Sequence, residues 1–299
     1  MVSPCPLMAA LHAIDKGVRF MPYTEKDIHE LRRIAADLRA DLIEMIPAGK
    51  VGHLGGSSSI MDVTAALYFK HMKVFSDPKA PQRDRCIFSK GHAVLAQYAA
   101  FAELGYISRE DLKKVKTLDG TLQGHPDMDH TPGIEAVTGS LGQGLSVSLG
   151  MALGLRLDHS GSRVYCIVGD GEMDEGQIWE AAMAGAAHQA DNLVAIIDRN
   201  GVQATDTVDN VLPNKNIKEK WEAFGWNTIE IDGHDMQQIL DALDAAKSCK
   251  GKPTAIIANT IKGKGFPFAE GKAAYHNAAM TEDEYKQALK VVERMREEA

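Results

Sequence analysis

The chain has 299 residues, of which 44% are hydrophobic and 25% charged, and its formal net charge is -8. This composition is typical of a folded globular protein and argues against long disordered regions away from the ends. The acidic balance, with a pI near 5.8, argues against nucleic-acid and membrane-surface binding, because both need clustered lysine and arginine. We therefore expect a small molecule or another protein as the partner, and no nucleic acid or membrane.

The N-terminal sequence and the cysteines point to no special compartment. No apolar run reaches the roughly 18 residues needed to span a bilayer. The opening MVSPCPLMAALHAIDKG has neither a basic n-region nor a clear cleavage site, so we expect a cytoplasmic protein. Cys5, Cys86, Cys166 and Cys249 show no C-x-x-C spacing, and we expect buried or incidental thiols.

The first part of the chain begins with a long predicted helix. Residues 24–46 carry apolar positions at helical spacing, with Thr24 as a candidate N-cap and Pro47 just past the end. A glycine-rich loop, VGHLGGSSS, is expected next. Residues 119–144 are dense in Gly, Pro and His, which predicts a long irregular segment of the kind that is usually functional. Between the loop and this segment we expect a helix near 60–72, a strand at 85–89 and a helix that opens after Gly91 and His92.

From residue 144 onward, strands alternate with helices. This alternation predicts βαβ units and a doubly wound α/β fold, with a mainly parallel sheet and helices on both faces. Because no repeat or low-complexity linker interrupts the chain, we expect a single domain over 1–299, with a peripheral N-terminal segment at 1–23 and a polar C-terminal helix at 281–297. The expected elements are helices at 144–158, 175–190, 216–224 and 235–247, and strands at 163–168, 193–198, 226–231 and 253–259.

Polar residues end two successive predicted strands. VYCIVGD stops at Asp170, and LVAIIDRN ends about thirty residues later at Asn200. In a parallel sheet both lie at the carboxyl edge, where ligands bind close to helix N-termini that favour phosphate. A carboxylate there repels phosphate unless a divalent cation bridges them, and Mg²⁺ is usually held by few protein oxygens plus phosphates. The pair therefore predicts a magnesium and diphosphate site, with Gly169 and Gly171 allowing close approach of the backbone.

Each of these two residues also has an ordinary structural explanation. Asp170 could cap the following helix, and Asn200 could occupy a turn before Gly201, as these residue types often do. For either residue alone, that explanation is at least as good as a ligand role. For the pair at matched strand ends with flanking glycines, the metal site is the better hypothesis.

Several stretches, in the same order, resemble one family. GDGEMDEGQIWEAA through IIDRNGVQ is similar to the thiamin-diphosphate signature, in which G-D-G is followed about thirty residues later by Asn. VGHLGGSSS, DRCIFSKGHAVLAQYA, LQGHPD, PGIEAVTGSLGQG, KWEAFGWNTIEIDGHD and TIKGKG resemble the first domain of transketolase. The chain especially resembles the separately encoded N-terminal subunit of two-component transketolases, from about residue 25 to residue 276.

The resemblance implies thiamin diphosphate and Mg²⁺ as cofactors. Asp170 and Asn200, with the main-chain carbonyl of Val202, match the metal ligands. Glu175 resembles the acidic residue at the dimer contact between cofactor sites, although it could equally be a first-turn helix acid. The implied cofactor contacts are His92, Gly171 and Lys262 at the diphosphate, Gly139, Ser140 and Leu141 at the aminopyrimidine side, and Asn200.

Three histidines resemble the cluster that lines the transketolase substrate channel: His53, His125 and His276. In that reaction the cofactor acts as an electron sink while a two-carbon unit moves from a ketose to an aldose. Each step moves a proton on or off an oxygen near neutral pH, which suits imidazole. Asn277 follows His276 where the family usually has Gly, which weakens that match.

The other histidines are expected to have no chemical role. His234, within IDGHD, is expected to shape a turn before the next helix. The remaining six are expected on the surface or on helix faces: His12, His29, His71, His130, His159 and His188.

The chain ends at Ala299, before the pyrimidine-binding domain of a full transketolase. The resemblance places in that domain the glutamate that activates the cofactor, and most contacts to the substrate phosphate. We therefore expect activity only with a C-terminal subunit of the pyrimidine-binding type, in an α2β2 assembly acting on sugar phosphates. The loop DRNGVQATDTVDNV lacks the basic or glycine-bearing variants often found there, which leaves the shape of the metal loop open.

Four further functions compete with this hypothesis. One is a specialised transketolase subunit for an unusual ketose, such as a sulfonated or branched sugar. A deoxyxylulose-phosphate synthase or a dehydrogenase-type thiamin enzyme fits less well, because the histidine positions and KWEAFGW favour transketolase. The last is a non-catalytic diphosphate-binding scaffold subunit, which the intact Asp170, Asn200, His53 and His125 argue against.

Overall fold

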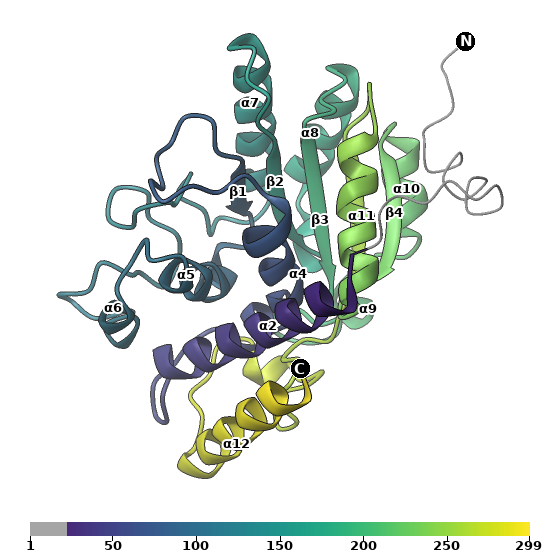
Figure 1. The fold of residues 1–299 in the computed structure, drawn as a ribbon. Helices are drawn as coiled ribbons and strands as arrows, with labels where there is room; N and C mark the ends of the chain where they lie inside the picture. Colours follow the sequence, from purple (N-terminus) through teal and green to yellow (C-terminus); the bar gives the residue numbers. More distant parts are fainter. Residues whose placement is uncertain (1–22) are drawn as a thin grey trace.

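A five-stranded, all-parallel sheet organises the structure, a computed structural model that describes residues 23–299. The strand order is β1-β2-β3-β5-β4, and the α/β fold class expected from the sequence is confirmed (Figure 1). The strands are β1 (Arg85–Phe88), β2 (Val164–Gly169), β3 (Leu193–Arg199), β4 (Asn227–Asp232) and β5 (Thr254–Asn259).

Side chains of the central strands enter two separate hydrophobic cores. In β2, Tyr165 and Ile167 belong to one core, whereas Cys166 and Val168 belong to the other. The alternation follows from the period of two in a strand, and it explains why β2 is apolar throughout: a parallel sheet is buried on both faces.

Helices cover both faces of the sheet. The first core is completed by α2 (Glu25–Met45), α4 (Met61–Ala66), α5 (Val94–Glu103), α11 (Met236–Ser248) and α12 (Glu282–Glu298). The second is completed by α7 (Gln143–Leu157), α8 (Gly176–Ala187) and α10 (Ile217–Ala223). Short elements are α3 (Leu54–Ser59), α6 (Arg109–Lys113), α9 (Val208–Val211), a π-helical turn at Leu67–His71, and 3-10 turns at Gly91–Ala93, Gly171–Asp174 and Ala273–Tyr275.

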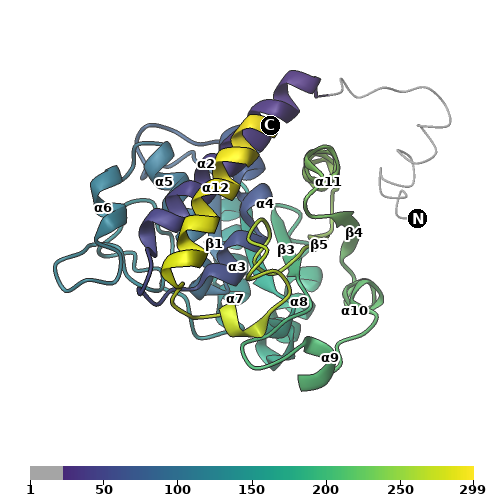
Figure 2. The same ribbon diagram turned by 90° about the horizontal axis from the view of Figure 1, so that it is seen from below.

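The first and last described helices, α2 and α12, pack against each other. They run side by side in Figure 1, and Figure 2 shows the same pairing from below. Thr24 and Thr281 each form a capping box with an acid three residues on, Asp27 and Glu284. A capping box satisfies two backbone donors that the helix cannot, which explains why both helices begin where they do.

One expected loop is a helix in the structure. The segment VGHLGGSSS was expected to be irregular, but Leu54–Ser59 forms the buried helix α3. Its serine hydroxyls are satisfied nearby, since Ser57 donates to the carbonyl of His53. A Cβ at Gly55 would lie 2.9 Å from the Lys262 side chain, and one at Gly56 would lie 3.3 Å from His92. The glycines are there because α3 packs closely against these two side chains.

The other expected elements match to within a few residues, and two short helices were missed. Residues 119–142 are irregular as expected, before α7 begins at Gln143. The missed helices are α6 and α9, each less than two turns long. Cys86, Cys166 and Cys249 are buried, whereas Cys5, His12 and almost all of the expected N-terminal segment at 1–23 lie outside the described residues. Across residues 23–299, every helix is too short or too polar to cross a membrane.

Candidate functional site

All five strands deliver a polar residue to the same edge of the sheet. Lys90 follows β1, Asp170 follows β2, Asn200 follows β3, His234 follows β4 and Lys262 follows β5. Because the strands are parallel, these residues lie at the carboxyl edge, where ligands of open α/β sheets bind. Asp170 and Asn200 were expected here from the strand pattern and Lys262 from the family resemblance, whereas the topology adds Lys90 and His234.

Asp170 is a buried carboxylate without a cationic partner. One of its oxygens accepts from the amide of Gly171 at 2.9 Å, and the other accepts from the amide of Gly201 at 2.6 Å. Among residues 23–299 no side chain forms an ion pair with it. Burial and then the nearby Asp198 carboxylate raise the pKa of Asp170 to about 6. The hydrogen bond to Gly201 is the feature that a simple cap of the following turn does not explain, because it joins the ends of β2 and β3.

The three predicted metal ligands lie around one short turn. Asn200 and Val202 flank Gly201, whose amide Asp170 binds. The Asn200 side-chain oxygen accepts from the amide of Val202 at 3.2 Å, and its amide nitrogen donates to Asp198 at 2.9 Å. Within residues 23–299, no group of three or more His, Cys, Asp and Glu is arranged to hold a metal. The available oxygens are thus one carboxylate and neutral carbonyls, a set that suits Mg²⁺ carrying phosphate ligands.

Lys262 is a buried ammonium without a carboxylate partner. Its Nζ donates to the carbonyl of Val202 at 2.7 Å and lies 2.9 Å from Nδ1 of His276. No ion pair involves it in the part of the chain that the structure describes. Burial and then the Lys90 charge lower the pKa of Lys262 to about 8.

The fit of the site to a metal and a diphosphate rests on these two unmatched charges. A buried charge is costly unless it is paired. Within the described part of the chain, Asp170 has no paired cation and Lys262 has no paired anion, and both groups contact the same turn through Gly201 and Val202. A divalent cation would neutralise the first and a diphosphate the second, so the residues present fit both groups.

A buried ion pair beneath the site was not expected from the sequence. The Lys90 ammonium contacts the Asp198 carboxylate and donates to the carbonyl of Gly56 at 2.8 Å. Although burial opposes ionisation, Lys90 and several hydroxyl donors keep the pKa of Asp198 below its ordinary value. The signal for Asp198 was present, since it is an acid inside an otherwise apolar strand, LVAIID. The donors to it are Lys90, Ser59, Asn200 and Thr260.

Glu172 is a second residue that the sequence analysis missed. It is buried, and it accepts from the amides of Gly142 at 2.9 Å and Gly169 at 3.0 Å and from the Ser89 hydroxyl. Burial raises the pKa of Glu172. Its side chain ties the turn at 139–142 to the end of β2, so it positions two predicted cofactor-binding segments relative to each other. Inside the acidic run GEMDE, nothing in the sequence distinguishes the buried Glu172 from the half-buried Asp174 and the exposed Glu175.

The predicted aminopyrimidine-side segment lies against the histidines. Gly139 has φ 140°, and a Cβ there would lie 2.6 Å from the His125 ring, so only glycine fits. Ser140 and Leu141 follow in the same turn, and Leu141 is exposed. Glu175 is exposed at the start of α8 and makes no side-chain cap to that helix. Its carboxylate lies at the N-terminal end of α8, where the helix dipole favours an acid, so the ordinary explanation for Glu175 and the dimer-contact prediction both fit this position.

Four histidines cluster beside Lys262. The rings of His92 and His276 are 4.7 Å apart between centroids, and His53 lies 5.3 to 5.7 Å from His92, His125 and His276. The structure therefore brings together His53, His125 and His276, predicted as a substrate-channel set, with His92, predicted as a diphosphate ligand. Exposure increases from the buried Lys262 to the exposed His125, so the cluster forms a path from the turn at residues 200–202 outward.

The clustered histidines are held neutral. Burial lowers the pKa of His53 to about 3, followed by the neighbouring imidazoles of His276 and His125. Burial, followed by the Lys262 charge, lowers the pKa of His276 to about 4. The pKa of His92 falls to about 2 for the same reason, with Lys90 the main neighbour. A neutral imidazole accepts a proton at one nitrogen and can donate at the other, so at pH 7 the cluster can receive protons from substrate hydroxyls.

The model of a known protein family matches most of the chain. The match to "Transketolase, thiamine diphosphate binding domain" covers residues 30–293. The chain belongs to this family. Among curated relatives, the 6-deoxy-6-sulfo-D-fructose transketolase subunit SqwG of Clostridium sp. (strain MSTE9) is 45% identical over 89% of this chain and 97% of its own length. One subunit of the apulose-4-phosphate transketolase of Phocaeicola vulgatus is 42% identical over 85% of this chain and 90% of its own.

Solved transketolases share the fold. The transketolase of Campylobacter jejuni aligns with 91% of this chain at a TM-score of 0.80 and 32% identity, and the alignment covers 43% of that protein. The chain thus corresponds to about two-fifths of such a transketolase, whereas it spans nearly all of the relatives that are named as subunits. The resemblance inferred from the motifs is confirmed.

In this transketolase domain, the neutral histidines predict a loss of stability in acid. The unfolded chain binds protons at its histidines below about pH 6.5, while folded His53 stays neutral down to about pH 3. The unfolded state then carries more protons, so stability falls as the pH drops. We expect His53→Gln to flatten this fall by up to about 1.4 kcal/mol per pH unit below pH 6. Urea unfolding of both proteins at pH 7, 6 and 5 measures it, and parallel curves would contradict the assignment.

His234 anchors the segment that carries Lys262. Its Nε2 accepts from the amide of Ile261 at 2.9 Å, so the proton is on Nδ1, which donates to Asp62 at 2.8 Å. Arg39 binds the same carboxylate through both of its terminal nitrogens, at 2.9 and 2.8 Å. His234 lies in the expected turn before α11. In addition, its side chain links α2 and α4 to the residue before Lys262.

Loss of this anchor should weaken cofactor binding more than turnover. We expect His234→Ala to raise the Kd of thiamin diphosphate about 10- to 100-fold, the usual cost of removing a group that orients a ligand-binding residue. Saturating cofactor should then restore most of kcat. His130→Ala is the control, because His130 is exposed and pairs with Asp127 away from the sheet edge. An unchanged Kd would show that Lys262 is positioned without His234.

His71 lies away from this edge of the sheet. It was expected on a surface or helix face, but it is buried beside Tyr165, with Asp244 at 3.5 Å, because the π-helical turn directs it inward.

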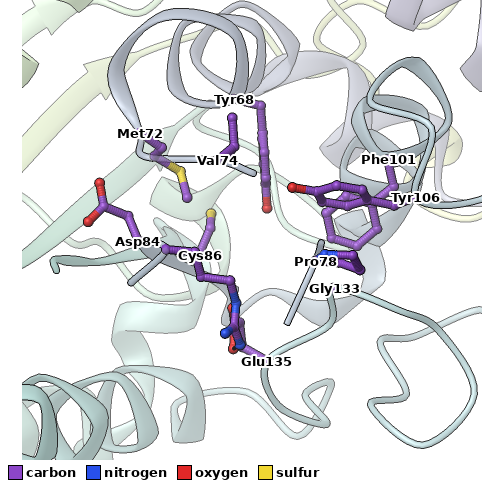
Figure 3. A pocket seen from close by; sticks show the side chains of 11 residues that line it. Tyr68, Met72, Val74, Pro78, Asp84, Cys86, Phe101, Tyr106, Gly133 and Glu135 are labelled. Atoms are coloured by element: carbon purple, nitrogen blue, oxygen red, sulfur yellow. Dashed lines mark hydrogen bonds and ion pairs between the residues drawn. The ribbon is translucent and has the colours of Figure 1, made fainter. Parts of the chain in front are cut away.

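A cavity of about 20 Å³ lies near the start of β1 (Figure 3). It has room for about one water molecule, so it takes no substrate. Its lining includes Tyr68, Met72, Cys86, Phe101 and Glu135.

Proposed function

We propose that this chain is the N-terminal subunit of a two-component transketolase that uses thiamin diphosphate and Mg²⁺ to transfer a two-carbon ketol unit from a ketose phosphate to an aldose phosphate. The observation that carries the proposal is the pair of unmatched buried charges, Asp170 and Lys262, on one turn beside four neutral histidines. Family membership supports the cofactor, and the oxygen donors around the turn at residues 200–202 support the metal.

Each predicted residue has a role in this proposal. Asp170, Asn200 and the carbonyl of Val202 hold Mg²⁺. Glu175 lies at the contact between cofactor sites of the assembled enzyme, which its exposed position at the start of α8 supports. The groups that contact the cofactor are His92, Gly171, Asn200 and Lys262 at the diphosphate side, and Gly139, Ser140 and Leu141 at the aminopyrimidine side.

The histidines handle protons during the carbon–carbon bond changes. Thiamin diphosphate, when bound, supplies the electron sink for the two-carbon unit. As the donor ketose is cleaved, its C3 hydroxyl loses a proton, and the acceptor's new hydroxyl oxygen gains one when the bond to it forms. His53, His125 and His276 are neutral and lie within one cluster, so they can take the first proton and return the second.

The proposed assembly is an α2β2 enzyme in the cytoplasm, with a C-terminal subunit that carries the pyrimidine-binding domain. In it, residues 1–299 form a single domain with 1–23 and 281–297 at its periphery. The names of the two relatives, which are themselves subunits, support a partner. Apolar residues exposed on α7 and α8 support a contact surface on that face: Val147, Leu157 and Met183. A hollow of about 460 Å³ next to Asp174 and Trp179 adjoins it.

A specialised sugar is the second candidate. Relatives at 45% and 42% identity are named for 6-deoxy-6-sulfo-D-fructose and for apulose 4-phosphate, one sulfonated and one phosphorylated. Both carry an anionic end, so an unusual anionic ketose as the donor is consistent with the same site. A non-catalytic scaffold is disfavoured, because it would have no need for four clustered neutral histidines.

The test is reconstitution. The chain is prepared with and without its C-terminal partner, supplied with thiamin diphosphate and Mg²⁺, and assayed for ketol transfer to ribose 5-phosphate. The donors are xylulose 5-phosphate, 6-deoxy-6-sulfo-D-fructose and apulose 4-phosphate. Turnover is expected only when both proteins are present. Turnover by the isolated chain would contradict the two-component proposal, and cofactor binding without turnover of any ketose would favour the scaffold.

A further inference from the structure

Two lysines, Lys50 and Lys116, lie at the exposed end of the histidine cluster and have no acidic partner among residues 23–299. The Lys116 ammonium donates to the carbonyl of Val51 at 3.1 Å, two residues before His53. Its stem lies against Gly124, where a Cβ would come within 3.3 Å of it, one residue before His125. Lys116 therefore bridges the two segments that carry these histidines.

The backbone holds Lys116 in this place. Its φ is 57°, a left-handed conformation that is uncommon for lysine. Its amide donates to the carbonyl of Leu122 at 2.9 Å, which closes the turn between the two residues. Such conformations cost about 1–3 kcal/mol and gather at functional sites. The turn therefore fixes the position of the Lys116 side chain, unlike that of a freely moving surface lysine.

The charge at this position is not neutralised by the chain. Within residues 23–299, neither Lys116 nor Lys50 lies in an ion pair, whereas neighbouring Lys113 pairs with Glu110 at 2.8 Å. Lys50 is half-buried, and burial followed by the Lys116 charge lowers its pKa. After burial, Lys116 also contributes to the lowered pKa of His125. Positive charge therefore gathers where the histidine cluster opens to solvent.

We infer that Lys116, supported by Lys50, receives the anionic terminal group of the sugar, a phosphate or a sulfonate, while the reacting carbons lie among the histidines. The inference rests on the proposed function and deepens it, because it assigns part of substrate recognition to this chain. Lysine acts as a compact point charge with three donors, so it serves phosphate and sulfonate oxygens alike. Contacts from the C-terminal partner supplement it.

The kinetic test compares anionic and neutral ketoses in the reconstituted enzyme. Lys116→Asn removes the charge, and asparagine tolerates the left-handed backbone. We expect KM for xylulose 5-phosphate to rise about tenfold or more, since hydrogen bonds to charged groups are worth about one to two factors of ten, with kcat within about twofold. KM for neutral erythrulose should not change. Lys113→Asn is the matched control. A 6-deoxy-6-sulfo-D-fructose arm distinguishes sulfonate from phosphate as the preferred group.

A binding measurement separates this inference from the proposed function. In the full chain without partner, inorganic phosphate or sulfate should shift the imidazole NMR signals of His53 and His125, and Lys116→Asn should abolish the shift. If no ketose is turned over but the shift is present, the anion site stands and the proposed function fails. If turnover occurs and Lys116→Asn alters neither KM nor the shift, the inference is overturned. Equal losses on neutral and anionic ketoses would also overturn it.

Discussion

Asp170→Ala should abolish Mg²⁺-dependent binding of thiamin diphosphate, with a loss in affinity of about 100-fold or more. Removing one partner of a buried charged contact costs about 2–5 kcal/mol or more, and about 2.7 kcal/mol is already 100-fold. Calorimetric titration of the chain with its partner, at fixed Mg²⁺, measures the effect. Asp174→Ala is the control, because Asp174 lies in the same turn and its side chain accepts a hydrogen bond from Gln203 rather than from the amide of Gly201. Unchanged binding would show that the metal is held elsewhere.

The same position should be dispensable for folding stability, which separates a ligand from a structural cap. The pKa of Asp170 is raised to about 6, so the folded state retains a proton between about pH 4 and 6 that the unfolded state has lost. The stabilisation present below pH 4 is therefore lost as the pH rises through 6. At pH 7, without metal, the charged carboxylate destabilises the folded chain. Asp170→Asn should therefore unfold at a urea concentration equal to or higher than that of the unchanged protein. A marked loss of stability would assign Asp170 to the fold.

In contrast to Asp170→Asn, Asp198→Ala should lower the free energy of unfolding by about 3–5 kcal/mol. The substitution leaves the buried Lys90 ammonium without its carboxylate, and breaking one side of a buried pair has this typical cost. It also removes an acceptor from Ser59 and Asn200. Urea unfolding at pH 7 measures the loss.

A double variant tests whether the ion pair itself is the cause. Lys90→Met with Asp198→Leu removes both charges, and replacement of a buried pair by apolar residues is often neutral. It should therefore be more stable than Asp198→Ala. If both proteins are equally destabilised, the hydroxyl and amide contacts of Asp198 matter more than its pairing with Lys90.

The sheet edge was predictable from the sequence because its signals are local. Apolar runs with β-branched residues gave the strands, and a parallel sheet places their carboxyl ends together. Asp170 and Asn200 could be paired because β2 and β3 are consecutive in the chain and adjacent in the sheet. Lys262 and the histidines needed the family resemblance, since their segments are far apart in the chain.

What the sequence missed depends on tertiary packing. The composition of LGGSSS predicts a loop, and it forms α3 because burial against Lys262 and His92 outweighs helix propensity. The role of Glu172 is visible only in the folded chain, where its carboxylate accepts hydrogen bonds from the amides of Gly142 and Gly169. His71 looks like a surface residue on an amphipathic helix until the π-helical turn rotates it inward.

The contact between Lys262 and the carbonyl of Val202 has a consequence for how the cofactor binds. The turn from Asn200 to Val202 is already fixed, by Asp170 on one side and by Lys262 on the other. The entropy of ordering this turn is therefore lost when the chain folds and not when ligand arrives, which favours affinity through preorganisation. Under the proposed function, Lys262 would hold the diphosphate and would exchange its hydrogen bond to the Val202 carbonyl for one to a phosphate oxygen. Binding would then need only a local exchange of hydrogen-bond partners at a turn that is already ordered.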